Sequence, residues 1–303
     1  MHSGSRKALL LAGNGFIGRR VATVLALGEC RAVIHHTGRA AVPSLPGITS
    51  VIANRTPPPI VSFPDLSASA GGDVAIHFLC MGGDDAKAFV RSFDGRVRRL
   101  VLISSCDVYR AYGRFIGTEP GQPDPTPLDE SAPTRESLYP YRSKSTNRGQ
   151  LEYWYDKLEA ERVIQGTAQS EFVILRLPKV YGAGSRNGLQ TVYGFAHQPP
   201  WRWTHGHVDN IASAIALVAF HPNAAGQVFN LGEAQTPTTG ERLARLPQRD
   251  DFEPAAGDYD FRQNLHFDTT KVRNCLGYKD VVSEVDAMQA LAASNGRNLP
   301  VSH

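Results

Sequence analysis

Three side chains of this 303-residue chain have the types and spacing needed for proton exchange with a hydroxyl group. Tyr153 precedes Lys157 by four residues in the strongly helical stretch YWYDKLEAE, so we expect both side chains on one helical face, one turn apart. A free tyrosine, with a pKa of about 10, is a poor base at neutral pH, and a nearby ammonium lowers that pKa. Ser105 ends an apolar run, where its hydroxyl would hold a substrate oxygen at the carboxyl end of a strand.

These assignments have competing interpretations. PYRSK contains a second pair, Tyr141 and Lys144, but these residues are three apart in a proline-bounded segment, whereas Lys157 is followed by the helical LEAE. We therefore favour the pair that ends in Lys157, although this spacing also occurs by chance and some aromatic residues here must belong to the core. Ser104 is the alternative to Ser105, because neighbours on a strand point to opposite faces.

A glycine-rich turn near the start of the chain has the spacing of a dinucleotide phosphate site. In ALLLAGNGFIGRRV an apolar run breaks into three glycines and then resumes with helical spacing. The first glycine would permit a tight turn, the second the approach of a pyrophosphate, and the third the packing of helix on strand. The residues expected to contact the cofactor here are Gly13, Asn14, Gly15, Phe16, Ile17 and Gly18. A glycine-rich corner without a ligand is the alternative, since this spacing alone is a weak indication.

The second part of the dinucleotide fingerprint is an acid at the end of the second strand, which binds the ribose hydroxyls of NAD. No Asp or Glu occurs between Cys30 and Pro64, and Arg39 follows the expected strand in AVIHHTGRAA. A guanidinium pairs well with the 2′-phosphate of NADP, so the sequence slightly favours NADP over NAD. A solvated loop arginine is the competing interpretation.

The elements that position these residues alternate between apolar strands and helices. We expect strands at 7–13, 32–36, 48–53, 73–80, 99–105 and 172–178, and helices at 16–28, 84–93 and 151–169. Continuous apolar strands separated by helices indicate a parallel sheet covered on both faces, which is an α/β fold of the Rossmann, doubly wound type. We place this domain at 1–180, with a long loop at 113–149. A smaller, mainly C-terminal substrate-binding region would occupy 181–303, with 205–232 returning to the Rossmann core.

Five motifs, in this order, resemble the extended short-chain dehydrogenase/reductase superfamily, the NAD-dependent epimerase/dehydratase family. They are GNGFIG at 13–18, SSCDVY at 104–109, YWYDKLEAE at 153–161, LRLPKVYGAG at 175–184 and GHVDNIA at 206–212, and the resemblance covers nearly the whole chain. The resemblance implies that Tyr153 exchanges the proton, that Lys157 tunes it and orients the nicotinamide ribose, and that Ser105 positions the substrate oxygen. It also implies that Pro178 lies beside the nicotinamide carboxamide.

The chain departs from the family pattern at three places. Ala12 stands where the family usually has the first glycine of GxxGxxG. Lys179 replaces an asparagine that contacts substrate in the nucleotide-sugar enzymes, although a lysine could still meet a phosphate. Ser105 is followed by Cys106 and Asp107, whereas the sugar dehydratases follow their threonine with Asp-Glu. These departures argue against dehydration and make a sugar-nucleotide substrate less expected.

Composition excludes several classes of protein. The net charge of +3 suits an anionic small ligand and is too weak to indicate nucleic acid. No apolar run approaches the roughly 18 residues of a membrane span. Four scattered cysteines without a CxxC pair fit the reduced thiols of a cytoplasmic protein and give no sign of a metal site. We expect a small-molecule substrate, no nucleic-acid or membrane partner, and a homodimer as the assembly to test.

The sequence therefore predicts an NAD(P)-dependent oxidoreductase or epimerase that moves a hydride between nicotinamide and a secondary alcohol or ketone carbon of a polar small molecule. The alternative is a non-catalytic relative that binds dinucleotide as a sensor, or that binds RNA or protein. The cluster of Arg96, Arg98 and Arg99 is the one hint of an RNA surface, and we favour a solvated approach to a strand as its explanation.

Overall fold

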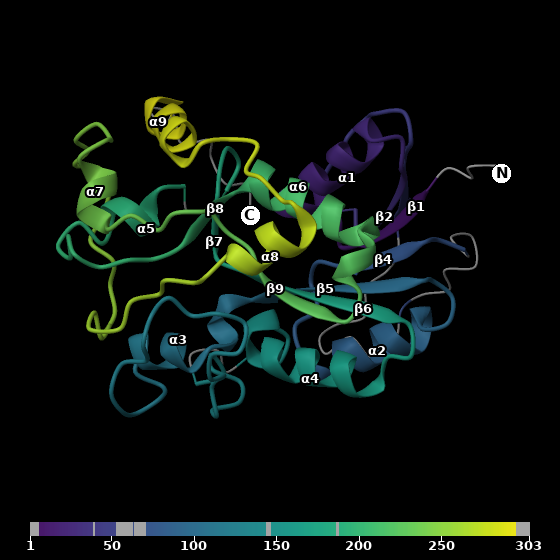
Figure 1. Ribbon diagram of the computed structural model, residues 1–303, viewed down its shortest axis with the longest axis horizontal. Coiled ribbons are helices and arrows are strands. Elements are labelled where there is room, and N and C mark those ends of the chain that lie inside the picture. The colour runs from purple at the N-terminus through teal and green to yellow at the C-terminus, as the bar shows by residue number, and fades with distance from the viewer. Residues whose placement is uncertain are drawn as a thin grey trace.

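A parallel sheet forms the centre of the computed structural model, which describes residues 6–38, 40–52, 63, 71–143, 147–185 and 188–294 (Figure 1). Within these ranges seven strands lie in the order β3-β2-β1-β4-β5-β6-β9, and every neighbouring pair is parallel. The strands are β1 (Lys7–Leu11), β2 (Arg31–His36), β3 (Ile48–Ile52), β4 (Val74–His77), β5 (Arg99–Ser105), β6 (Glu171–Leu177) and β9 (Gln227–Asn230). The strand order reverses between β1 and β4, as in doubly wound dinucleotide-binding folds. The predicted Rossmann-type α/β fold is confirmed.

Helices cover both faces of the sheet. In Figure 1, α1 and α6 lie on one side of the strands, and α2 and α4 lie on the other. The helices of the described residues are α1 (Phe16–Leu27), α2 (Gly83–Phe93), α3 (Arg110–Phe115), α4 (Lys157–Thr167), α5 (Gln190–Tyr193), α6 (Val208–Phe220), α7 (Thr239–Leu243), α8 (Thr270–Leu276) and α9 (Glu284–Ser294). Short 3₁₀ turns are η2 (Cys106–Val108), η3 (Leu151–Trp154) and η4 (Pro222–Ala224). None of these helices has both the length and the apolar character needed to cross a membrane.

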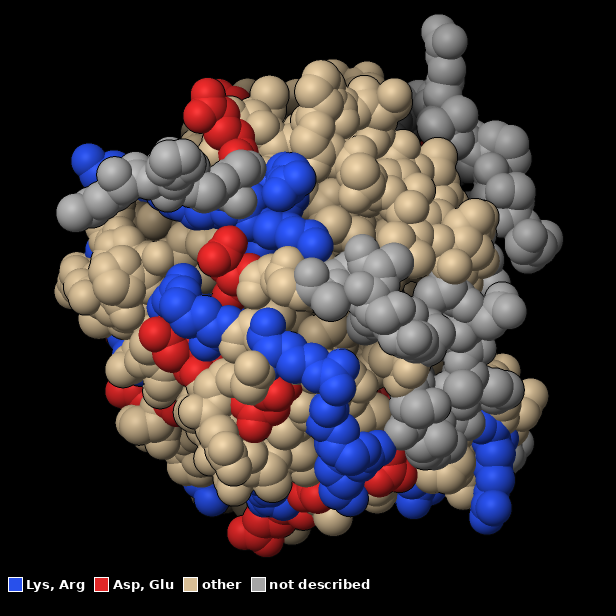
Figure 2. All heavy atoms as spheres, turned by 90° about the vertical axis from the view of Figure 1, so that its right-hand side faces the viewer, with Lys and Arg blue, Asp and Glu red and all other residues tan. Residues whose placement is uncertain are grey.

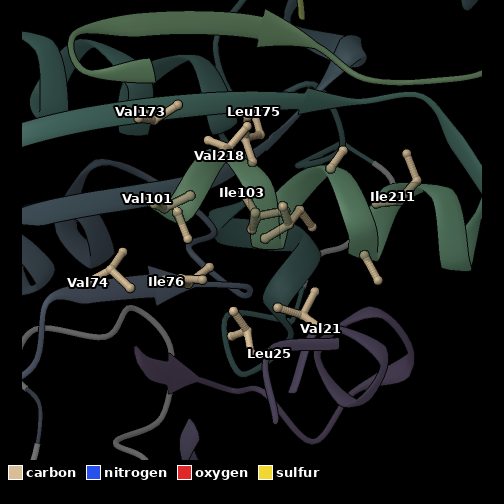
Figure 3. Close-up of a cluster of buried hydrophobic side chains, with 14 of the residues drawn as sticks. Val21, Leu25, Val74, Ile76, Val101, Ile103, Val173, Leu175, Ile211 and Val218 are labelled. Atoms are coloured by element: carbon tan, nitrogen blue, oxygen red, sulfur yellow. The ribbon is translucent and has the colours of Figure 1, made fainter. Parts of the chain in front are cut away.

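Alternation along β5 divides its side chains between two cores. Val101 and Ile103 pack with residues of α1 and α6, as the close-up in Figure 3 shows. Leu100 and Leu102 instead join the core under α2 and α4. Because successive side chains of a strand point to opposite faces, the middle of this strand, residues 100–103, is apolar on both faces. The same alternation decides where the polar residues at its carboxyl end point.

The C-terminal part of the chain lies beyond the carboxyl ends of the strands. A second, two-stranded parallel sheet pairs β7 (Lys179–Tyr181) with β8 (His205–His207). Helices α5, α7 and α9 lie at this end of the molecule in Figure 1, whereas α6 packs against α1 and β9 pairs with β6. An aromatic cluster that includes Phe115, Trp201 and Phe267 joins these segments to the loop after β5.

The arginine cluster at the start of β5 braces the fold. Arg99 is fully buried, and its guanidinium donates hydrogen bonds to carbonyls at the end of α6, including those of Val218 (2.7 Å) and His221 (2.8 Å). Arg98 and Arg99 share an ion pair with Glu171, each at 2.8 Å. Figure 2, which views the side of the molecule where β1 begins, shows Lys and Arg interleaved with Asp and Glu. The cluster therefore does not form a continuous basic surface.

Candidate active site

The glycine turn joins β1 to α1 beside the point where the strand order reverses. A Cβ added to Gly18 would lie 2.5 Å from the carbonyl oxygen of Gly13, and one added to Gly13 would lie 2.7 Å from the Cβ of Leu10. These two glycines are required by packing. A Cβ on Gly15 would meet only the carbonyl oxygen of Ala12, at 3.8 Å, so the protein itself leaves this position open. The open position and the uncapped first turn of α1, whose N-cap Gly15 contributes no side chain, suit a phosphate group.

Two neighbours of the glycines fix the shape of the turn. Ala12 adopts a left-handed backbone conformation, with φ of +57°, where the family pattern has glycine. Its amide donates to the carbonyl of His35 at 2.8 Å, so the strained residue is held by β2. Asn14 donates from Nδ2 to the carbonyl of Ala40 at 3.1 Å and thereby ties the turn to the loop after β2. Phe16 and Ile17 open α1, whereas Arg39 lies outside the described residues.

The two serines at the end of β5 point to opposite faces. Ser104 is buried, and its hydroxyl donates to Oε1 of Glu161 at 2.5 Å. Arg176 pairs with the same carboxylate at 2.7 Å and also donates to the carbonyl of Glu130 at 3.1 Å. Ser104 therefore belongs to a buried network beneath the site. Ser105 is half-buried, and its Oγ accepts a hydrogen bond from the Asp107 amide at 3.3 Å. Of the two serines, Ser105 is the one left to face a ligand.

The predicted helix at 151–169 is wrong at its start, because α4 begins at Lys157. Asp156 is the N-cap of α4, and its carboxylate accepts from the Glu159 amide at 3.3 Å. The same carboxylate forms a buried ion pair with Arg135 at 2.6 Å. These bonds fix the first residue of the helix at Lys157. Tyr153 therefore lies outside α4, and Tyr153 and Lys157 do not share a helical face. The sequence Asp-x-x-Glu at 156–159 is a typical start of a helix. The prediction of a helix at 151–169, based on helical spacing alone, did not use it.

Tyr153 lies in η3, among basic and aromatic side chains. The guanidinium of Arg142 lies 4.6 Å from the centre of its ring, and that of Arg148 lies 5.7 Å from it. Arg142 also donates from Nε to the Tyr153 carbonyl at 3.2 Å, and Trp154 packs edge-on against the ring at 5.0 Å. Among the described residues, the ring and hydrogen-bond contacts of Tyr153 are thus with Arg142, Arg148 and Trp154, and none is with Ser105 or Lys157. Its catalytic role stays a prediction from the sequence.

Lys157 occupies the first turn of α4 and is buried against β5. Its Nζ donates to the carbonyl of Ile103 at 2.9 Å and lies 6.0 Å from the ring centre of Tyr155. Burial lowers the pKa of this ammonium, although the nearby Cys80 and Asp107 act in the opposite direction. The Lys157 ammonium therefore lies beside Ile103, two residues before the end of β5. This is the same edge of the sheet as the glycine turn.

The structure brings together a cluster of hydroxyls that the sequence did not predict. Oδ2 of Asp107 accepts from the hydroxyl of Tyr155 at 2.6 Å and from that of Tyr141 at 3.0 Å. Ser105 also interacts with the Tyr155 hydroxyl and acts to lower the pKa of that phenol, and Tyr141 does the same for the pKa of Tyr112. Tyr141 belongs to the PYRSK segment, whose Lys144 lies outside the described residues. The acid next to Ser105 was visible in the sequence, but its partners lie 34 and 48 residues away along the chain.

Two further residues line the junction of β6 and β7. Pro178 connects the two strands, and its Cγ would lie 3.3 Å from a Cβ on Gly206 or Gly232, so it packs closely on both backbones. Lys179 is half-buried, and this burial lowers the pKa of its ammonium. Elsewhere in the described ranges, no group of three or more His, Cys, Asp or Glu side chains is arranged to hold a metal ion, and all four cysteines are free.

Comparisons with solved structures match the whole chain. The Bordetella bronchiseptica enzyme WbmG in complex with NAD aligns over 97% of this chain and 96% of its own, with 15% identity and a TM-score of 0.69. The dTDP-glucose 4,6-dehydratase of Bacillus anthracis in complex with NAD aligns over 95% and 96%, with 15% identity and a TM-score of 0.69.

A short-chain dehydrogenase/reductase superfamily protein of Agrobacterium tumefaciens with bound NAD aligns over 95% and 96%, with 18% identity and a TM-score of 0.63. No protein-family model matches the sequence, and no curated protein matches it. The chain therefore has the fold of the extended short-chain dehydrogenases/reductases, as its motifs led us to expect.

Proposed function

We propose that this protein is an NAD(P)-dependent oxidoreductase or epimerase that acts on a secondary alcohol or ketone carbon of a polar small molecule. The observation that carries the proposal is the meeting, at one edge of the sheet, of an open glycine turn with Ser105, Lys157 and a tyrosine hydroxyl. Sites in open α/β sheets form outside the carboxyl ends of the strands, where the strand order reverses. The NAD-bound structures of the same fold support this reading.

The chain's own residues would hold the dinucleotide along this edge. The turn from Gly13 to Gly18 would bind the pyrophosphate through backbone amides, because Gly15 leaves room for a phosphate to approach. Lys157 and Pro178 would contact the nicotinamide end. When bound, the nicotinamide ring accepts or returns a hydride. NADP is slightly favoured, because the loop after β2 offers an arginine, Arg39, and no acid.

Ser105 and a tyrosine would act on the substrate oxygen. A hydroxyl at the half-buried end of β5 can hold a carbinol or carbonyl oxygen while a neighbouring phenol exchanges its proton. Lys179, whose ammonium is half-buried at the start of β7, would favour a substrate that carries an anionic group. We favour reduction or epimerisation over dehydration, since Cys106 and Asp107 follow Ser105 in place of Asp-Glu.

Binding of the dinucleotide is the first test. A ligand at 100 times its Kd stabilises the folded state by about 2.7 kcal/mol, which a thermal melt with and without NADPH or NADH detects. Gly15→Val should abolish this stabilisation while the protein stays folded, because its side chain fills only the space open to a phosphate. Gly166→Val is the matched control, since a Cβ there meets nothing within 4 Å and the residue lies in the last turn of α4, far along the chain from the glycine turn. An unchanged cofactor effect in Gly15→Val would reject the phosphate site.

A further inference from the structure

The carboxylate of Asp107 is the most unusual polar group of the site. It is buried, with 6% of the residue exposed, yet it lies one turn from the half-buried Ser105. Both recorded side-chain hydrogen bonds, from Tyr141 and Tyr155, reach Oδ2. Oδ1 is buried without a hydrogen-bond partner among the described residues. A buried carboxylate with one unpartnered oxygen is costly to keep, which points to a role other than packing.

Tyr155 is the tyrosine that joins this carboxylate to the rest of the site. Its hydroxyl donates to Asp107 at 2.6 Å, its ring centre lies 6.0 Å from Nζ of Lys157, and Ser105 also acts on its pKa. The contacts recorded for Tyr153 are with arginines and a tryptophan instead. Tyr153 lies in η3 and Tyr155 directly after it, and neither belongs to α4. The four-residue spacing of Tyr153 to Lys157 therefore does not decide which tyrosine hydroxyl reaches Ser105. Position decides it, and position selects Tyr155.

We propose that Tyr155 exchanges the proton with the substrate oxygen and that Asp107 takes the proton which Tyr155 gives up. This inference rests on the proposed function and names its acid–base pair. In the oxidative direction the substrate O–H bond breaks and its proton bonds to Oη of Tyr155. In the same step the original Tyr155 proton leaves Oη and bonds to Oδ2 of Asp107, while the hydride from carbon passes to the nicotinamide dinucleotide. Reduction reverses each transfer.

The charges around the pair favour a relay over a free phenolate. Burial and the adjacent carboxylate raise the pKa of Tyr155 well above its ordinary value, so a phenolate there is disfavoured. Burial also raises the pKa of Asp107, which makes it a better proton acceptor than an exposed carboxylate. The other groups that face Asp107 are the Tyr141 phenol and the cations Arg135 and Lys157, and these act against burial to lower its pKa.

Tyr141 would act as a positioning residue. Its hydroxyl donates to the same Oδ2 at 3.0 Å, and its ring packs edge-on against that of Tyr155 at 5.1 Å. It has no recorded bond to Ser105, so it holds the carboxylate in place while Tyr155 faces the substrate. From the sequence we weighed Tyr141 against Tyr153, and Tyr155, whose hydroxyl donates to Asp107, was not among the candidates.

The link between Tyr155 and Asp107 can be tested without substrate or cofactor. Protein labelled with ¹³C at tyrosine Cζ reports the ionisation of each phenol by NMR, and Tyr155→Phe identifies the resonance that disappears. In the wild type this resonance should stay that of a phenol between about pH 6 and about pH 10. In Asp107→Asn it should titrate at lower pH, because the negative charge beside it is gone. Ionisation of Tyr155 near neutral pH in the wild type, or no effect of Asp107→Asn, would overturn the relay.

Turnover then separates Tyr155 from Tyr153. With NADPH or NADH and a probe set of dTDP-glucose, UDP-glucose and simple secondary alcohols and ketones, Tyr155→Phe and Asp107→Asn should each slow the reaction by about 10²–10⁴-fold. Asp107→Glu should recover part of the loss. Tyr259→Phe is the neutral control, because among the described residues the hydrogen bond of that hydroxyl goes to the carbonyl of Ala256 and not to Asp107 or Ser105.

A larger loss in Tyr153→Phe than in Tyr155→Phe would overturn the assignment. Failure of the wild type to bind any dinucleotide would instead reject the proposed function, and the NMR result would still stand on its own.

Discussion

The buried ion pair of Arg135 with Asp156 determines where α4 begins, and Asp156→Asn should measure its contribution. The guanidinium and the carboxylate are 1% and 0% exposed and lie 2.6 Å apart. Asparagine is as good an N-cap as aspartate and keeps an oxygen for the amide of Glu159, so the change removes the charge and the hydrogen bond that Oδ2 accepts from the Tyr139 amide at 2.9 Å. The Arg135 cation then stays buried without its counter-ion. Breaking a buried pair in this way costs about 3–5 kcal/mol of unfolding free energy.

Urea unfolding, followed by circular dichroism, gives that free energy directly. The matched control is Glu159→Gln in the same helix, which removes a pair between Glu159 and Arg162 that is 31% and 53% exposed. Exposed pairs contribute about 0–1 kcal/mol, so this variant should unfold almost as the wild type does. Equal losses in the two variants, or a loss below about 1 kcal/mol in Asp156→Asn, would refute the reasoning.

Two further predictions concern strain and titration. Ala12→Gly should raise the melting temperature, because a left-handed alanine costs about 1–2 kcal/mol while glycine loses about 0.4–1 kcal/mol more chain entropy on folding; a lower melting temperature would show that the turn is not strained. Burial raises the pKa of Glu233 from 4.5 to about 7, so the folded protein binds this proton more tightly than the unfolded chain. Roughly 3 kcal/mol of stability should therefore be lost as pH rises from about 4.5 to about 7, and Glu233→Gln should reduce that loss in urea unfolding at the two pH values.

Local patterns in the sequence predicted the sheet well. The strand at 99–105 has the predicted bounds, and the other strands of the prediction differ from the structure by at most a few residues at each end, because continuous apolar runs report burial on two faces. The glycine spacing likewise predicted the turn, since the close approach of Gly18 to Gly13 is a local steric requirement. The same period-two alternation correctly separated Ser104 from Ser105.

The parts that depend on distant partners could not be predicted in this way. Asp156 begins α4 as its N-cap and pairs with Arg135, which precedes it by 21 residues, and no helical period contains that information. Tyr155 reaches Asp107 across 48 residues, so its place beside Ser105 appears only once the chain has folded. The spacing to Lys157 predicts Tyr153, whereas our proposal, which depends on these distant contacts, names Tyr155.

The Glu161 carboxylate, which binds Ser104 and Arg176, has a consequence for how this protein can diversify. This one buried acid joins α4 to the ends of β5 and β6. The three elements beneath the candidate site are therefore held together by a hydrogen bond and an ion pair as well as by the pairing of the strands. The helices α5, α7 and α9 lie outside this network. Loops carried on a rigid scaffold tolerate change better than the scaffold itself. New substrate ranges can therefore arise by substitution in those outer segments, while the groups that carry out proton transfer keep their positions.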